Sequence, residues 1–207
     1  MKIKKENKIY LDWGEFRNRI FRPLSYILTK IGLTPNSLSL LGVLFMLGFV
    51  LALKKNIYLS FVFFVLSIFA DGVDGVLARY QKVSSDRGRF IDRVCDNTSL
   101  FLFVLGLIYF QILNPVIGFV FFYIITLSKI FRMIENSFHF KSDWLFKTVG
   151  GPLPTTLVAI AYFEFFLLVF LNLNYFNLTL IIFSIVLFFD SVLFFRKIIQ
   201  RKKSKFC

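Results

Sequence analysis

The chain has 207 residues, of which 57% are apolar, 19% are aromatic and 18% are charged, with a formal net charge of +13. A soluble domain is typically about 45–50% apolar and about 25% charged, and a soluble core of this size could not bury so much apolar surface. The composition therefore excludes a disordered chain, a collagen-like chain and a secreted disulfide scaffold, and it predicts an integral membrane protein.

The N-terminal segment, residues 1–34, differs from the rest of the chain because basic residues are mixed with apolar ones. Residues 1–8 form a basic tail, and residues 11–30 place apolar side chains along one stripe that is flanked by arginines. This pattern is typical of a helix that lies in the membrane interface. We therefore expect a basic tail followed by an interfacial amphipathic helix.

Six longer apolar runs follow this segment, and each is close to the roughly 20 residues that a helix needs to cross the hydrocarbon. The runs are too long for barrel strands and their polarity does not alternate, so they indicate helices. The predicted spans cover residues 36–54, 57–78, 92–113, 115–134, 153–172 and 176–196. The expected fold class is an all-α integral membrane protein, with a six-span domain over residues 35–200 and a basic tail over residues 201–207.

The distribution of positive charge predicts the orientation of these spans. Lys and Arg number 23 in the segments on one side of the predicted spans and 2 on the other side. The positive-inside rule then places both termini in the cytoplasm. Topology and attraction to anionic lipid headgroups account for the basic excess, so we expect no nucleic-acid partner. In a prokaryote the expected location is the cell membrane.

Carboxylates are concentrated where the second and third predicted spans meet. Asp71 and Asp74 are three residues apart near the end of the second span, and Asp92 and Asp96 are four apart at the start of the third. Both spacings place a pair on one helix face, and a short polar hairpin over residues 80–88 makes the two helices antiparallel. We expect all four side chains to converge near the cytoplasmic membrane surface.

Four carboxylates at such a point would repel one another unless cations neutralise them. One or two hard divalent cations would do so, because Mg²⁺ and Mn²⁺ prefer carboxylate oxygens. Such a centre suits phosphoryl transfer, in which the metals hold a diphosphate and a spare carboxylate acts as general base. The alternative is that the aspartates only form ion pairs with nearby arginines: Arg79, Arg87, Arg89 and Arg93.

These aspartates belong to a longer motif with fixed spacing, which reads Asp71-x-x-Asp74-Gly75-x-x-Ala78-Arg79, eight residues, Gly88, three residues, Asp92, three residues and Asp96. The motif resembles the signature of the CDP-alcohol phosphotransferases, also called CDP-alcohol phosphatidyltransferases. The resemblance implies transfer of a phosphatidyl group from a CDP-linked lipid such as CDP-diacylglycerol to an acceptor hydroxyl, with release of CMP, in phospholipid biosynthesis. It also implies an active site that faces the cytoplasm and a homodimer.

The resemblance assigns a role to each position of the motif. Asp71, Asp74 and Asp92 would bind the metals, two Mg²⁺ or Mn²⁺ ions, and Asp96 would be a further ligand and the general base. The residues that would contact the nucleotide and the CDP-linked lipid are Thr34, Pro35, Asn36, Gly75, Ala78, Arg79, Ser85 and Gly88. Without the resemblance, Thr34 and Pro35 would simply be a helix N-cap followed by proline at the first helical position. Ser39 stands where many relatives have Thr.

The acceptor is less well defined by the sequence. Lys129 and Arg132 lie three residues apart in the fourth predicted span, where they would either bind an acceptor phosphate or extend to the interface as ordinary cationic flanks. The residues around Thr34 resemble the branch that uses inositol phosphate more than the branch that uses glycerol phosphate, so we favour a polyol phosphate. Glu164 and Asp190, in the last two spans, would line a polar groove or pair with a neighbouring chain.

The competing function class is a catalytically silent membrane protein, such as a divalent-ion carrier that uses the same aspartates. A carrier needs ionisable residues at mid-depth on several spans, because the ion must cross the whole hydrocarbon. The acidic cluster of this chain lies at one end of two predicted spans. That position favours chemistry at the membrane surface.

Overall fold

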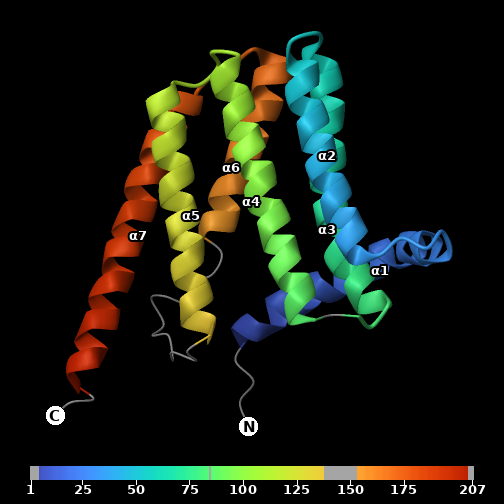
Figure 1. Ribbon diagram of the computed structural model, residues 1–207, viewed down its shortest axis with the longest axis horizontal. Helices are drawn as coiled ribbons and strands as arrows, with labels where there is room; N and C mark the ends of the chain where they lie inside the picture. Colours follow the sequence, from blue (N-terminus) through green and yellow to red (C-terminus); the bar gives the residue numbers. More distant parts are fainter. Residues whose placement is uncertain (1–4, 84, 138–152, 205–207) are drawn as a thin grey trace. The chain divides into compact units, whose positions relative to one another are not determined.

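The computed structural model describes residues 5–83, 85–137 and 153–204, and this part of the chain is helical throughout, with short connections (Figure 1). Its seven helices are α1 (Lys5–Lys30), α2 (Pro35–Leu53), α3 (Ile57–Tyr80), α4 (Asp86–Tyr109), α5 (Pro115–Ser137), α6 (Leu153–Leu171) and α7 (Phe176–Ser204). The predicted all-α class is therefore confirmed. Each of the six apolar runs contributes one helix, and the basic N-terminal segment contributes the helix before them.

Three helices of the described part are long and apolar enough to cross a membrane: α2, α3 and the Phe176–Leu193 stretch of α7. Shorter apolar stretches occur in α5, over Pro115–Phe131, and in α6, over Thr156–Leu171. Helix α4 carries six charged residues between positions 86 and 96, so its apolar part is confined to its second half. The six-span topology, the cytoplasmic termini and the domain boundaries at 34 and 200 stay predictions.

The connection between α3 and α4 is shorter than the hairpin predicted over residues 80–88. Helix α3 continues to Tyr80 and α4 begins at Asp86, which leaves residues 81–85 between them. The left-handed backbone of Lys82, with φ of 57°, lets the Val83 amide donate to the carbonyl oxygen of Ala78 at 3.1 Å. Such a bond closes the C-terminus of a helix and turns the chain back sharply. Helices α3 and α4 therefore run in opposite directions (Figure 1).

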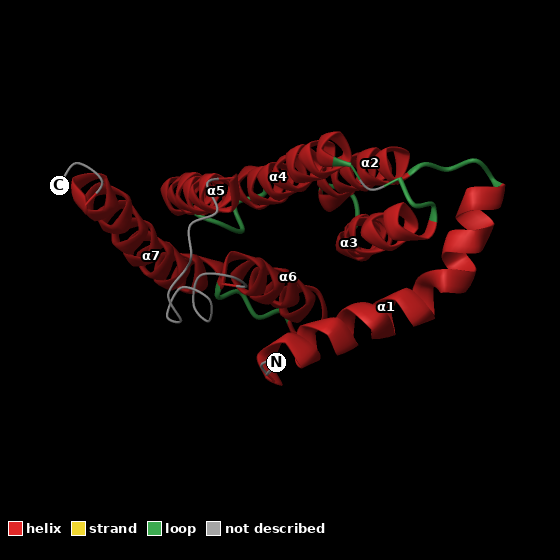
Figure 2. Cartoon of the chain, turned by 90° about the horizontal axis from the view of Figure 1, so that it is seen from below, coloured by secondary structure: helices red, strands yellow, loops and turns green. Residues whose placement is uncertain are grey.

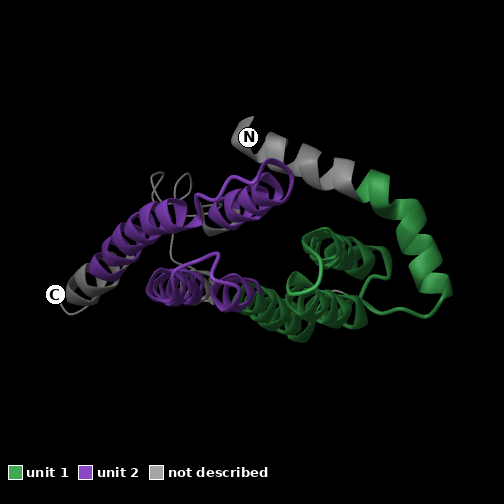
Figure 3. Ribbon diagram, turned by 90° about the horizontal axis from the view of Figure 1, so that it is seen from above, with its two compact units in different colours: residues 1–102 green, residues 103–207 purple. Residues whose placement is uncertain are grey.

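The chain divides into two compact units, residues 1–102 and 103–207, with α4 continuing from the first into the second (Figure 3). In the first unit α3 packs against both α2 and α1. Its buried centre consists of Leu38, Ala70, Val73 and Leu77, covered by Phe21, Leu24, Leu28, Leu41 and Phe45. Helices α2 and α3 are joined at Gly42, whose carbonyl oxygen accepts from the Ser67 hydroxyl at 2.8 Å.

Helix α1 bends along its length (Figure 2) and contains Pro23 in its interior. Proline lacks the amide that would donate to the carbonyl of residue 19, and its ring crowds that carbonyl, so a bend is expected there. The helix ends at Lys30, and the φ of 83° at Gly32 just beyond it allows the Leu33 amide to donate to the Leu28 carbonyl oxygen at 3.0 Å. The side-chain amide of Gln81, just beyond α3, donates through Nε2 to the Leu33 carbonyl oxygen at 2.9 Å and fixes this turn to the end of α3.

In the second unit α7 packs against α5 and α6. The buried ring of Phe103 makes edge-to-face contacts with Tyr162, Phe165 and Phe176, at centroid distances of 5.1, 6.0 and 6.3 Å. Aromatic pairs in this arrangement contribute beyond the apolar area that they bury. At one end of the unit, the Asn177 side-chain oxygen accepts from the Asn114 amide at 2.8 Å, which joins the start of α7 to the start of α5.

Candidate active site

Three carboxylates from two helices of the first unit form a compact group. Asp71 and Asp74 on α3 and Asp92 on α4 each offer an oxygen, and these three oxygens lie within 4.8 Å of one another. Asp74 lies six residues before the end of α3 and Asp92 six residues after the start of α4. At 1.5 Å per residue both are about 9 Å from the turn, so the short connection sets them at the same level. Asp74 is buried, Asp92 is half-buried and Asp71 is exposed.

Asp96 is not a member of this group of three among the described residues. It is half-buried on α4, four residues beyond Asp92, which is about 6 Å along the helix axis. The structure therefore brings together three of the four carboxylates that were expected to converge. The fourth lies about one turn further from the α3–α4 connection.

The donor set of the group fits a hard divalent cation. Octahedral ligands at about 2.1 Å from Mg²⁺ lie about 3 Å apart when adjacent and about 4 Å apart when opposite. Three oxygens within 4.8 Å of one another need only small side-chain rotations to reach those separations. All three donors are carboxylate oxygens, which Mg²⁺ and Mn²⁺ accept readily and which are poor ligands for soft metals.

Ion pairing does not compensate the negative charge of the group within the described part of the chain. The ion pair there joins Arg89 to Asp86, two residues of the first turn of α4 that lie outside the group. No lysine or arginine of the described part forms an ion pair with Asp71, Asp74 or Asp92. The alternative that these aspartates serve only as partners of nearby arginines therefore has no ion pair behind it in the described part, although Arg93 interacts electrostatically with Asp92.

Ser39 on α2 orients the buried member of the group. Its hydroxyl donates to Oδ2 of Asp74 at 2.6 Å and lies 3.2 Å from the Pro35 carbonyl oxygen. Both side chains are buried, so water competes little for this contact. The sequence alone assigned no role to Ser39. The only signal for one was a hydroxyl near the start of an otherwise apolar span.

The Arg79 side chain lies along α3 beside Gly75. Gly75 is one turn closer than Arg79 to the start of the helix. A Cβ added at Gly75 would be 3.6 Å from Nη1 of Arg79. The Nε of Arg79 donates to Oδ1 of Asn18 on α1 at 3.0 Å. Helix α1 thus fixes the guanidinium next to the backbone of Gly75. No pattern in the sequence indicates this contact, because the two residues are 61 positions apart.

The starts of α2 and α4 lie close together in the first unit. Thr34 is the N-cap of α2 and accepts from the Ser37 amide at 3.2 Å, while the Ser85 hydroxyl accepts from the Gly88 amide at 3.0 Å. A Cβ added at Gly88 would lie 3.2 Å from Oγ of Ser85 and 3.7 Å from Oδ1 of Asn36. Two helix N-termini, which favour anionic groups, therefore meet at Gly88.

The residues expected to select the acceptor belong to the second unit. Lys129 on α5 is half-buried, and the side chain of Arg132 lies outside the described residues. Glu164 on α6 is buried, and its Oε1 accepts from the Thr179 hydroxyl on α7 at 3.2 Å. Asp190 on α7 is half-buried. Glu164 therefore has a partner within its own chain.

Comparison with known proteins identifies the family. A curated protein of Aquifex aeolicus (strain VF5), described as an uncharacterized protein, is 29% identical over 85 residues, which are 41% of this chain and 43% of that protein. The chain thus spans less than half the length of this relative. The family model for CDP-alcohol phosphatidyltransferase matches residues 32–192, a region that includes the aspartate group and the starts of α2 and α4. Because this match covers most of the sequence, the chain belongs to the CDP-alcohol phosphatidyltransferase family.

Proposed function

We propose that this protein transfers the phosphoalcohol group of a CDP-linked lipid, such as CDP-diacylglycerol, to the hydroxyl of an acceptor and releases CMP. The observation that carries the proposal is the group of three carboxylate oxygens within 4.8 Å, contributed by Asp71, Asp74 and Asp92. Family membership supports the reaction class. The long apolar helices α2 and α3 of the same unit support a substrate that resides in a membrane.

In this proposal the three aspartates hold divalent cations, two Mg²⁺ or Mn²⁺ ions. When bound, the cations supply Lewis-acid stabilisation of the diphosphate and of the negative charge that develops on CMP. Ser39 keeps the Asp74 carboxylate in one orientation through Oδ2. Such outer hydrogen bonds commonly tune the affinity of a metal site.

The proposed chemistry is a single displacement at phosphorus. The acceptor oxygen forms a bond to the phosphorus that carries the lipid alcohol, and the bond from that phosphorus to the CMP oxygen breaks, its electron pair leaving with CMP. Asp96 takes the proton of the acceptor hydroxyl. Its place outside the group of three suits this role, because a carboxylate that binds a cation is a weaker base.

The residues around the aspartate group are proposed to hold the nucleotide. Arg79, fixed by Asn18, contacts the diphosphate, and the bare backbone at Gly75 lets the ligand approach α3 closely. The starts of α2 and α4 favour anionic and polar groups of the ligand. The residues that contribute there are Thr34, Pro35, Asn36, Ser85 and Gly88, with Ala78 leaving further space on α3.

The acceptor is proposed to be a polyol phosphate, inositol phosphate or glycerol phosphate. Lys129 and Arg132, one helical turn apart on α5, would bind its phosphate through charge-assisted hydrogen bonds. The protein is further proposed to span the membrane six times, to present the site to the cytoplasm and to act as a homodimer.

The experiment that tests the function is an assay of CMP release by the purified protein in nanodiscs. CDP-diacylglycerol is supplied with Mg²⁺ or Mn²⁺ and, in separate reactions, with glycerol phosphate, inositol phosphate or serine. CMP that requires both the metal and one acceptor supports the proposal and identifies the acceptor. Binding of the metal without CMP release from any CDP-linked donor would contradict it, and metal flux into proteoliposomes would then establish a carrier.

A further inference from the structure

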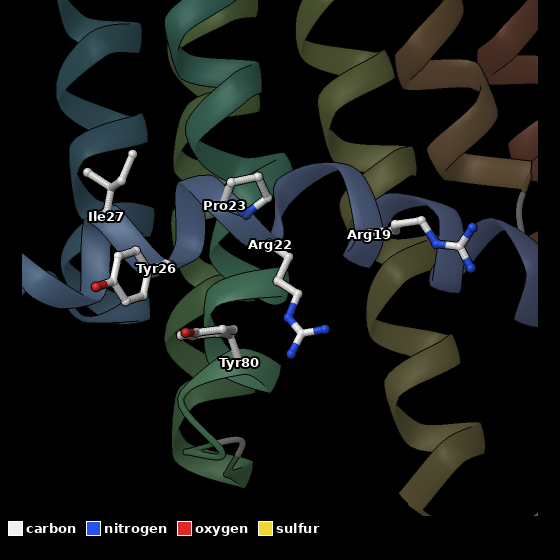
Figure 4. Close-up of a pocket in the computed structure, with 6 residues that line it drawn as sticks. All are labelled: Arg19, Arg22, Pro23, Tyr26, Ile27 and Tyr80. Carbon is white, nitrogen blue, oxygen red and sulfur yellow. The ribbon is translucent and has the colours of Figure 1, made fainter.

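A second cluster of polar side chains lies in the first unit, on the face where α1 crosses the end of α3. A pocket there is lined by Arg19, Arg22, Pro23, Tyr26 and Ile27 of α1 and by Tyr80 of α3 (Figure 4). None of these six residues belongs to the aspartate group or to the sequence motif. One residue of the motif nevertheless lies next to the pocket along the chain, because Arg79 is the residue before Tyr80.

The pocket has the charge of an anion site. Arg19 and Arg22 are three residues apart on α1 and both line the pocket, Arg22 beside Tyr80 and Arg19 further along the helix (Figure 4). Both side chains are exposed, and neither guanidinium forms an ion pair with a side chain that the structure describes. No acidic residue is among the described side chains that line the pocket. Two guanidinium groups and two phenol hydroxyls can donate to the oxygens of a phosphate.

The pocket also has an apolar side, which narrows the class of ligand. Pro23 and Ile27 contribute carbon surface, and Ile27 and Arg22 point to opposite sides of α1 (Figure 4). The Tyr26 side chain is 57% exposed, and two isoleucines near the pocket are exposed as well: Ile20 of α1 at 52% and Ile31, the residue after α1, at 69%. A free anion or an acidic peptide would leave this apolar surface in water, whereas a phospholipid covers it with acyl chains.

We infer that this pocket binds the phosphodiester headgroup of an anionic phospholipid, as a site separate from the one for the CDP-linked substrate. Arg19 and Arg22 hold the phosphate, the hydroxyls of Tyr26 and Tyr80 lie at headgroup level, and the acyl chains lie along Ile27. A headgroup that carries hydroxyls, such as glycerol, has one more hydrogen-bond acceptor within the pocket, the carbonyl oxygen of Arg19. Pro23 has no amide to bond the Arg19 carbonyl oxygen, which is left to accept from a headgroup hydroxyl.

The position of the pocket connects it to the candidate active site. Asn18, the residue before Arg19, accepts from Nε of Arg79, the residue before Tyr80. A headgroup that bridges Arg22 and Tyr80 holds α1 against the end of α3 and so favours the contact between Asn18 and Arg79. This consequence, unlike the binding itself, rests on the proposed function.

The test measures lipid binding directly. Full-length protein is taken from nanodiscs of phosphatidylcholine with increasing phosphatidylglycerol, and retained phosphatidylglycerol is counted by native mass spectrometry. Wild type should show saturable binding that Arg19→Gln with Arg22→Gln weakens about 30-fold, since each surface cation contributes about a factor of five. Tyr80→Phe, which removes one hydroxyl, should weaken binding about threefold.

Two matched variants separate a defined site from diffuse charge attraction. Lys54→Gln with Lys55→Gln removes the same charge from exposed positions between α2 and α3 and should bind like wild type. Arg19→Lys with Arg22→Lys keeps the charge but loses the planar guanidinium, and should still bind several-fold more weakly. Equal losses in the two glutamine pairs would overturn the inference, and so would wild-type binding by the lysine pair.

A further arm distinguishes a lipid from a free anion. Excess inorganic phosphate should displace little phosphatidylglycerol, because it lacks acyl chains to cover the apolar side. Complete displacement would show a simple anion site and overturn the lipid assignment. CMP release, measured in the same nanodiscs, should rise with phosphatidylglycerol in wild type and less in the arginine variants. Lipid binding without any CMP release would leave this inference standing and contradict only the proposed function.

Discussion

The two units place their carboxylates in contrasting surroundings. In the first unit Asp71, Asp74 and Asp92 gather three oxygens within 4.8 Å, so negative charge is concentrated without an ion-pair partner in the described part. In the second unit Glu164 is buried as a single carboxylate, and its Oε1 accepts from the Thr179 hydroxyl. The first arrangement suits a divalent cation, whereas the second is a contact between helices.

Other buried side-chain oxygens also differ between the two units. In the first unit the Ser39 hydroxyl is directed at Asp74. In the second unit, atoms buried without a hydrogen-bond partner in the described part of the chain are distributed over three helices: Oγ1 of Thr126, Oγ of Ser128 and Ser191, and Oε2 of Glu164. We therefore expect the proposed phosphoryl transfer to depend on the buried polar side chains of the first unit. The buried polar side chains of the second unit are expected to affect helix packing.

The largest effect is expected from the aspartate group itself. Asp92→Asn removes one negative charge and weakens the hold on the cations, which contribute several kcal/mol to the transition state. CMP release should fall by about 1,000-fold or more. Asp86→Asn is the matched control, because Asp86 is an acid of the same helix that pairs with Arg89 outside the group. Comparable losses in both variants would show that total charge near α4 matters and the group does not.

The next effect separates the proposed base from the metal ligands. Asp96→Asn cannot accept the proton of the acceptor, and a positioned general base contributes about 100-fold or more. CMP release should fall by at least about 100-fold, while Mn²⁺ binding, followed by electron paramagnetic resonance, stays close to wild type. Full activity in this variant would remove Asp96 from the mechanism. Loss of Mn²⁺ binding would make it a ligand instead.

A smaller effect is expected if the second unit selects the acceptor. Lys129→Ala with Arg132→Ala removes two cations proposed to bind the acceptor phosphate, and the KM for that acceptor should rise about 30-fold. The KM for the CDP-linked donor should change little. If both KM values remain unchanged, these cations serve only at the membrane interface. The residues that bind substrates would then all belong to the first unit.

Much of this arrangement could be predicted from the sequence, because apolar runs and residue spacing fix helices and helix faces. Each predicted span forms a helix, and the spacing of Asp71 and Asp74 together with a short connection to α4 was enough to bring Asp92 beside them. Thr34 caps α2 as its place before Pro35 suggested. These features are local, so they depend on few unknown angles.

The remainder of the site depends on how each helix is rotated and what packs on it. Asp96 follows Asp92 by four residues, but the spacing does not fix whether both reach the same point, and only Asp92 joins the group. The contact of Asn18 with Arg79 and that of Ser39 with Asp74 join helices across 61 and 35 positions. No periodicity in the sequence encodes such pairs.

The contact between Ser39 and Asp74 should have a modest effect on metal affinity. Ser39→Ala removes the hydroxyl that orients Asp74, and loss of a supporting hydrogen bond of this kind typically weakens metal binding about 10- to 100-fold. We expect about a tenfold rise in the Mg²⁺ concentration that gives half-maximal CMP release. Ser39→Thr keeps the hydroxyl and should restore wild-type behaviour. An unchanged Mg²⁺ requirement in the alanine variant would show that Asp74 is held by packing alone.

The smallest effect is expected in the second unit, at the contact between Thr179 and Glu164. Thr179→Val keeps the side-chain shape and removes the donor, and hydrogen bonds between membrane helices contribute on average about 0.6 kcal/mol. The midpoint of thermal unfolding in detergent should fall by about 2 °C, with CMP release unchanged. Glu164→Gln preserves an acceptor for Thr179 and should unfold like wild type. If instead Thr179→Val abolished CMP release, Glu164 would belong to the reaction, and buried polar groups of the second unit would have to be counted as part of the active site.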